Sequence, residues 1–241
     1  MSVPFFRLPR QPVFPHPDLA EPDGLLAAGG DLSEARLLHA YRQGIFPWYS
    51  RGEPILWWSP DPRMVLFPEE LHLSRRMQRV IRSETFQART DTAFAEVIEA
   101  CAHIPRRKER GTWIVRDMQK AYTALHQAGW AHSVEAWQDG LLAGGLYGVS
   151  TGRAFFGESM FSRCSNASKF ALYALVQICL GRGIRFIDCQ FHTEHLARCG
   201  AREISRGEYL QRLEESQREE ALPGLWTGLP EEPATKRKNG I

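Results

Sequence analysis

"AHSVEAWQDGLLAGGLYGVS", residues 131–150, decides the fold class of this chain. Two runs of strand-forming residues flank the pair Asp139-Gly140, and such a pair accepts the positive φ angles of a tight hairpin turn. The next run, "GRAFFGESMFS" at residues 152–162, has the same aromatic, strand-like character. The region therefore predicts a β-meander of three strands.

Helical patterns lie on both sides of this meander, because apolar residues recur there every three or four positions between capping residues and glycines. The expected helices span 73–83 (capped by Ser74), 91–103 (Asp91 or Thr92), 116–129 (ended by Gly129), 166–183 (Asn166 or Ser165, ended by Gly181 or Gly183), 194–200 and 207–220. Two further strands are expected at 184–191 and 202–205.

The first 62 residues have a different composition. Most of the prolines fall there, and proline and glycine favour turns and short extended pieces over long elements. One short helix is expected at residues 34–43, capped by Asp31 or Ser33 and ended by Gly44. We expect a small N-terminal domain at residues 1–62, a larger domain at 63–232 and a disordered tail at 233–241.

The order of these elements predicts an α+β protein. This order fits a mixed sheet of the acetyltransferase-like (GNAT) type, because it consists of three helices, a meander, a helix, a strand, a helix and a strand. The larger domain should have this fold.

Composition excludes several classes of protein. The chain is 43% hydrophobic and 24% charged, which is typical of globular proteins rather than disordered ones. No apolar run reaches about 18 residues, so no membrane-spanning helix is predicted. Prolines interrupt the opening segment, which therefore does not resemble a signal peptide. The five cysteines form no CxxC pair, and we expect a cytoplasmic protein.

The net charge of +2 is too small to indicate a nucleic-acid partner by itself. Local clustering matters more than the total. Four arginines fall within eight positions of one expected helix, namely Arg75, Arg76, Arg79 and Arg82.

"FIDCQFHTEH", residues 186–195, places several ionisable groups at the end of an apolar strand. Zinc could be bound by cysteine and histidine ligands, but the strand separates Cys189 from the helix that follows, and the spacing is not that of known zinc modules. A Cys189 nucleophile is disfavoured because the adjacent Asp188 would raise the pKa of the thiol. The four candidate zinc ligands are Cys189, His192, His195 and Cys199.

Three other groups have both a structural and a functional interpretation. Asp188 and Gln190, at i and i+2 of a strand, should share a face, where they either cap the sheet edge or present an amide oxygen to a substrate amine. Glu158 is either an exposed carboxylate or the charged group of a pocket lined by aromatic residues and methionine. Tryptophans at 48, 57, 58 and 113 either stack on unpaired bases or pack the small domain onto the large one.

Taken together, the motifs resemble the leucyl/phenylalanyl-tRNA–protein transferase family over roughly residues 20 to 228. The tracts that carry the resemblance are "EPDGLLAAGGDLS", "AYRQGIFPWYS", "LWWSPDPR", "GTWI", "AHSVEAW", "GGLYGV", "GESMFSR", "NASK" and "IDCQ". Enzymes of this family move leucine or phenylalanine, and methionine less well, from aminoacyl-tRNA to an N-terminal arginine or lysine. Their products enter N-degron proteolysis.

The resemblance implies roles for individual residues. Gln190 accepts from the incoming amine, Asp188 holds Gln190, and Glu158 pairs with the amino group of the aminoacyl moiety. The side-chain pocket is lined by Leu146, Phe155, Met160, Leu175 and Ile187; Trp48 and Trp113 pack around the terminal adenosine; Arg75, Arg76, Arg79 and Arg82 meet acceptor-stem phosphates. A monomer without metal or cofactor is implied.

Three alternatives remain open. An acyl-CoA N-acetyltransferase should have a glycine-rich pyrophosphate loop, whereas the helix after Ser165 begins "NASKFAL". A cell-wall aminoacyl transferase would need a peptidoglycan precursor as acceptor. A non-catalytic RNA-binding module would leave Asp188, Gln190 and Glu158 without a purpose.

Overall fold

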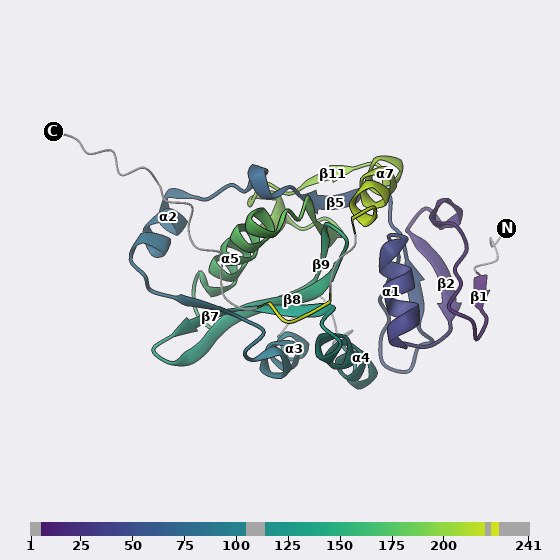
Figure 1. Cartoon of the computed structure of the whole chain (residues 1–241), viewed down its shortest axis with the longest axis horizontal. Helices are drawn as coiled ribbons and strands as arrows, with labels where there is room; N and C mark the ends of the chain where they lie inside the picture. Colours follow the sequence, from purple (N-terminus) through teal and green to yellow (C-terminus); the bar gives the residue numbers. More distant parts are fainter. Residues whose placement is uncertain (1–5, 105–113, 220–222, 227–241) are drawn as a thin grey trace.

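The computed structural model describes residues 6–104, 114–219 and 223–226, and it contains two sheets (Figure 1). The smaller sheet has the strand order β1-β2-β4-β3 and carries helix α1 (Glu34–Arg42). Its strands are β1 (Phe6–Leu8), β2 (Leu25–Gly29), β3 (Phe46–Pro47) and β4 (Leu56–Trp58).

The larger sheet has seven strands in the order β11-β5-β10-β9-β8-β7-β6. The central pair β9–β10 is parallel and every other pair is antiparallel, so the sheet is mixed and the predicted α+β class is confirmed. The strands are β5 (Arg63–Leu66), β6 (Gln87–Thr90), β7 (Ala131–Gln138), β8 (Leu141–Thr151), β9 (Ala154–Ser162), β10 (Phe186–Gln190) and β11 (Arg202–Ile204).

The predicted meander is confirmed as β7, β8 and β9. Asp139 and Gly140 both have positive φ, 51° and 77°, as the hairpin turn requires. Strands β5 and β6 were not predicted. Both are only four residues long, and β5 is buried along its whole length, so it has no alternating pattern to reveal it.

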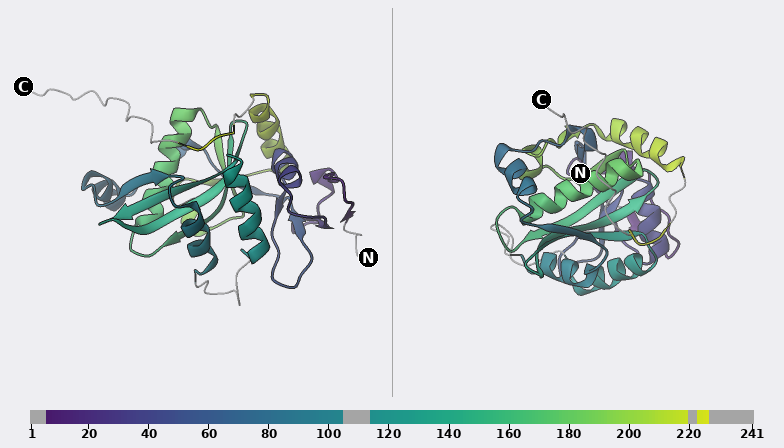
Figure 2. Two further views of the ribbon diagram at one scale, coloured as in Figure 1. Left: turned by 60° about the horizontal axis from the view of Figure 1, so that its bottom comes forward. Right: turned by 60° about the vertical axis from the view of Figure 1, so that its left-hand side comes forward.

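Helices cover both faces of the larger sheet. Figures 1 and 2 show α5 on one face and α3 and α4 on the other, with α2 at one end and the smaller sheet at the opposite end. The bounds are α2 (Arg75–Arg82), α3 (Phe94–Ala102), α4 (Arg116–Gln127), α5 (Ala167–Arg182), α6 (Glu194–Ala197) and α7 (Arg206–Gln217). None of the helices described is long and apolar enough to cross a membrane.

Two of the predicted helix caps are wrong. The backbone N–H groups of Thr92 and Ala93 donate to Glu135 of β7, at 3.0 and 2.9 Å, so a neighbouring strand satisfies the start of α3 in place of Asp91 or Thr92. At the start of α5, Asn166 adopts a left-handed conformation and its side chain makes no capping bond. Ser162 accepts from the backbone of Ser168 instead. The predicted caps Ser33 and Ser74 are confirmed.

One continuous apolar core joins the smaller sheet to the larger one. Tyr41, Phe46 and Trp57 from the first 62 residues pack in the same cluster as Phe156 and Tyr209. The boundary at residue 62 falls between the sheets and stays a prediction. The expected tail at 233–241 lies outside the described residues.

Candidate active site

The candidate active site begins where two parallel strands separate. The last paired residues of β9 and β10 are Phe156 and Asp188. Beyond this pair, β9 continues to Ser162, while β10 ends at Gln190, whose φ of 63° turns the chain away. The separation leaves space between the strands, and the polar ends of both strands face it.

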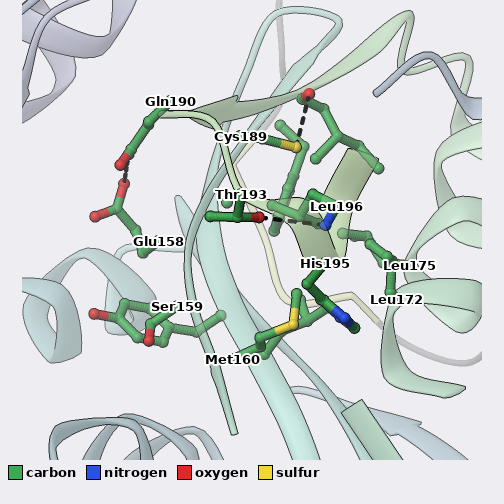
Figure 3. A pocket seen from close by; sticks show the side chains of 15 residues that line it. Glu158, Ser159, Met160, Leu172, Leu175, Cys189, Gln190, Thr193, His195 and Leu196 are labelled. Atoms are coloured by element: carbon green, nitrogen blue, oxygen red, sulfur yellow. Dashed lines mark hydrogen bonds between the residues drawn. The ribbon is translucent and has the colours of Figure 1, made fainter. Parts of the chain in front are cut away.

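A cavity of about 290 Å³ occupies this space (Figure 3). Its wall is mostly apolar and comes from β8, β9, β10, α5 and α6. Figure 3 shows Glu158 and Gln190 on one side and Leu172, Leu175 and His195 on the other. The lining residues are Leu146, Tyr147, Phe155, Gly157, Glu158, Ser159, Met160, Leu172, Leu175, Ile187, Cys189, Gln190, Thr193, His195 and Leu196.

The structure brings together all five predicted pocket residues, Leu146, Phe155, Met160, Leu175 and Ile187. Sequence reasoning missed two aliphatic neighbours, Leu172 and Leu196. Leu172 precedes Leu175 by one helical turn, so helical periodicity could have identified it. Leu196 has no comparable signal, because it lies on a helix of four residues.

Asp188 does not line the cavity; it lies behind it in a buried ion pair. Arg63 of β5 donates from Nε to Oδ1 (2.9 Å) and from a terminal nitrogen to Oδ2 (2.7 Å). The hydroxyl of Tyr209 on α7 also donates to Oδ2 (2.8 Å). Asp188 is fully buried, so these charge-assisted bonds replace the water it has lost.

Arg63 is fixed between two rings. Its guanidinium carbon lies 4.8 Å from the ring centre of Phe46 and 4.5 Å from that of Tyr209. Burial disfavours the charged guanidinium, but the charge interactions and hydrogen bonds of Asp188 and Tyr209 together outweigh it and raise the pKa of Arg63 above its usual value. Arg63 therefore stays charged inside the protein.

The predicted relation between Asp188 and Gln190 is wrong in one respect, because Asp188 does not hold the side-chain amide of Gln190. A register shift and the positive φ of Gln190 interrupt the strand between the two residues. Asp188 accepts from the backbone N–H of Gln190 (2.9 Å), whereas the side-chain amide of Gln190 donates to Glu158 (2.9 Å). Asp188 thus holds the backbone, Glu158 holds the amide, and the amide oxygen of Gln190 is left as an acceptor at the cavity wall.

Glu158 is the most heavily coordinated group of the cavity. The hydroxyls of Tyr41 on α1 and Tyr122 on α4 donate to Oε1 (2.8 Å) and Oε2 (3.0 Å), and these two hydroxyls also contact each other. Burial raises the pKa of Glu158 to about 7, against the opposing effect of the hydroxyl donors, and the charge of Asp188 adds to the rise. Three donors occupy three of about four acceptor positions on a carboxylate, so about one position remains open.

Sequence comparisons decide the family. The profile described as "Leucyl/phenylalanyl-tRNA protein transferase" matches residues 65–214, and that of its N-terminal domain matches residues 30–61. The chain belongs to this family. It is 57% identical to "Leucyl/phenylalanyl-tRNA--protein transferase" of Solidesulfovibrio magneticus over 93% of this chain and 91% of that one. It is 60% identical to the protein of the same name from Nitrosomonas europaea over 86% of each chain. This membership makes the protein an aminoacyltransferase.

Two solved structures are also similar to the chain. A GCN5-related N-acetyltransferase from Kribbella flavida is 8% identical and covers 70% of this chain and 60% of its own, with a TM-score of 0.34. L-PGS from Bacillus licheniformis is 12% identical and covers 68% and 55%, with a TM-score of 0.37.

Of the remaining predicted residues, those that the structure describes lie apart from the cavity wall. Trp48 packs edge-on against Trp58 (5.5 Å) and lies 5.3 Å from Phe191, just after β10. Trp113 lies outside the described residues. Arg75, Arg76, Arg79 and Arg82 are all exposed on α2.

Neither alternative chemistry at residues 189–199 finds support. The described residues contain no group of three or more His, Cys, Asp or Glu side chains arranged to hold a metal ion. The pKa of the Cys189 thiol is raised, mainly by burial and then by Asp188, which disfavours the nucleophilic thiolate.

Proposed function

We propose that this aminoacyltransferase moves leucine or phenylalanine, and methionine less well, from aminoacyl-tRNA to the α-amine of proteins that begin with arginine or lysine. The products then enter N-degron proteolysis in the cytoplasm. The observation that carries the proposal is an apolar cavity with one carboxylate and one amide oxygen at its wall, because an aminoacyl ester has an apolar side chain, an ammonium group and a carbonyl to be positioned.

The apolar wall selects the side chain. Leu146, Leu175 and Ile187 offer no hydrogen bond, so the cavity favours uncharged groups. An apolar side chain without a branch at Cβ, such as leucine, phenylalanine or methionine, can extend from the backbone into the cavity. Valine and isoleucine carry their branch at Cβ, where it would clash with the wall.

Glu158 and Gln190 position the two amino groups of the reaction. The free acceptor position of Glu158 pairs with the ammonium of the aminoacyl group, and the amide oxygen of Gln190 accepts from the attacking α-amine. The amine nitrogen bonds to the ester carbonyl carbon, the bond to the ribose oxygen breaks, and the amine proton passes to that oxygen. Positioning alone can supply much of the rate, because the ester is already activated.

Asp188 acts through Gln190 as a positioning residue. It fixes the backbone N–H of Gln190, and Arg63 and Tyr209 fix Asp188 in turn. Outside the cavity, Trp48 and Trp113 would pack around the terminal adenosine. The arginines of α2 would contact acceptor-stem phosphates, and the protein would act as a monomer.

One transfer assay tests this function. Purified protein is mixed with radiolabelled phenylalanyl-tRNA and a protein beginning with arginine, and the same protein beginning with alanine serves as the control. Label should reach only the first acceptor, and isoleucyl-tRNA should be a poor donor. Gln190→Ala should lower kcat roughly hundredfold, since misplacement of the amine removes the benefit of orientation. If the protein transfers label to neither acceptor, or uses acetyl-coenzyme A instead, the proposal is wrong.

A further inference from the structure

A second cavity, of about 270 Å³, adjoins the first. It lies between the start of α2, the first turn of α5 and the end of α6. Nothing in the proposed chemistry of the ester uses it. Its main lining residues are Ser74, Met77, Lys169, Leu172, His195 and Arg198.

The cavity is positively charged. Lys169 and Arg198 line it together with two histidines, His72 and His195, and no carboxylate lines it. Among the described residues, no Asp or Glu oxygen lies within 4.0 Å of the Lys169 or Arg198 nitrogens. A cavity with uncompensated cations is built to attract an anion.

His195, which lines this cavity, also has an unused hydrogen-bonding atom. Its Nε2 is buried and has no hydrogen-bond partner among the described residues. The pKa of His195 is lowered, first by burial and then by the charges of Lys169 and Arg198, so both cations act on this ring. A bound anion would give the ring nitrogen a partner and offset the repulsion between the cations.

The position of the cavity relates it to the donor. His195 and Leu172 line both cavities, so the two lie side by side. On its other side, Ser74 and Met77 begin α2, whose four arginines are exposed. Residues 191–198 run past both cavities, and Phe191 at the start of this segment packs on Trp48. Aromatic rings and a cationic groove are the features that bind single-stranded nucleic acid.

We infer that Lys169, Arg198 and His195 bind a backbone phosphate of the single-stranded 3′ end of the donor RNA, between the aminoacyl cavity and α2. The inference rests on the proposed function, and it adds a phosphate site that lies outside the α2 arginines. The site holds the RNA strand that leads into the aminoacyl cavity.

Two donors test this site. Phenylalanyl-tRNA contains the phosphates, whereas 3′-O-phenylalanyl-adenosine carries the same ester and no phosphate. In the double variant Lys169→Gln/Arg198→Gln, kcat/KM should fall about tenfold with phenylalanyl-tRNA and stay at the wild-type value with phenylalanyl-adenosine. The slope of log kcat/KM against log salt concentration should become shallower by about 0.7 for each phosphate that the variant no longer neutralises.

The matched control is Lys120→Gln/Arg218→Gln, which removes the same charges from exposed positions on α4 and after α7. It should leave both donors unaffected. An equal loss with both donors, no loss with either, or an equal loss in the control would overturn the phosphate site while transfer by the wild type still supports the proposed function. A wild-type protein that uses neither donor would overturn both.

Discussion

Arg63 keeps a full charge in the interior, and Asp188 is the reason. Both side chains are about 1% exposed or less, so each depends on the other for the interactions that water would otherwise provide. Removing one partner leaves the other as an unpaired buried charge, which is more costly than removing both.

Arg63→Met should therefore lower the free energy of unfolding by about 3–5 kcal/mol at pH 7, measured by urea denaturation. Arg63→Met/Asp188→Asn should recover part of this loss, because it leaves no unpaired charge. Equal instability of the single and double variants would contradict the explanation.

Glu158 makes stability depend on pH in the direction opposite to that of an ordinary salt-bridged carboxylate. Its pKa is about 7 in the folded protein, against an ordinary value of 4.5 for an exposed glutamate, so the folded state binds more protons than the unfolded state between these values. The contribution of Glu158 to stability is full below pH 4.5 and falls as pH rises to 7, by a total of about 3 kcal/mol.

Glu158→Gln should remove this fall, because glutamine does not titrate. Urea denaturation of both proteins at pH 5 and pH 7.5 gives the comparison. The difference in stability between the two pH values should be smaller in the variant by about 2 kcal/mol. An unchanged difference would mean that Glu158 is ionised throughout this range.

The sequence identified the apolar cavity better than it identified the groups that hold its polar residues. The pocket residues, which lie between positions 146 and 187, came from the resemblance to a known family. Arg63 is 125 residues from Asp188, and Tyr41 is 117 residues from Glu158. No local pattern predicts such pairs. The positive φ of Gln190 was missed as well, because the "DCQ" run gives no sign that the strand ends in a left-handed residue.

Among the elements, β8 and β9 supply much of the cavity wall. Two glycines, Gly148 and Gly157, face each other across these strands. A Cβ on Gly148 would lie 2.2 Å from the carbonyl oxygen of Phe156 and 2.6 Å from the ring of Phe155. A Cβ on Gly157 would meet nothing closer than 3.5 Å. Only the first position has no room for a side chain.

Gly148→Ala should therefore lower the melting temperature, and Gly157→Ala should not. Overpacking typically costs about 1–3 kcal/mol, which corresponds to roughly 2–4 °C per kcal/mol for a chain of this size. Thermal denaturation followed by circular dichroism compares the two variants. Similar melting temperatures would show that the strands move apart at little cost.

Long helices and the meander were predictable because periodicity and turn residues specify them locally. The 16 residues of α5 and the Asp139-Gly140 turn are examples. Short elements and caps were not, since their partners come from elsewhere. Glu135 satisfies the start of α3 from 42 residues away, and β5 exists only because β10 and β11 pair with it.

At the scale of the whole molecule, the smaller sheet is part of the site. Its region supplies Tyr41, which donates to Glu158, and Phe46, which packs on Arg63. The apolar core is continuous from Trp57 to Phe156, so the first 62 residues and the rest cover each other's apolar surface. Separation of the two parts would expose this surface and leave Glu158 without one of its donors.

The chain should consequently unfold in one cooperative transition. Urea denaturation followed by far-ultraviolet circular dichroism, which reports on all elements, and by tryptophan fluorescence, to which Trp57 and Trp58 of the smaller sheet contribute, should give the same midpoint. The control is the variant in which phenylalanine replaces Trp57 and Trp58. Its fluorescence reports mainly on the larger sheet, and the midpoint from fluorescence should still equal the midpoint from circular dichroism. Two separate midpoints in the unmodified chain would instead show that residues 1–62 fold as an independent domain. In that case the hydrogen bond between Tyr41 and Glu158 is too weak to couple the unfolding of the two parts.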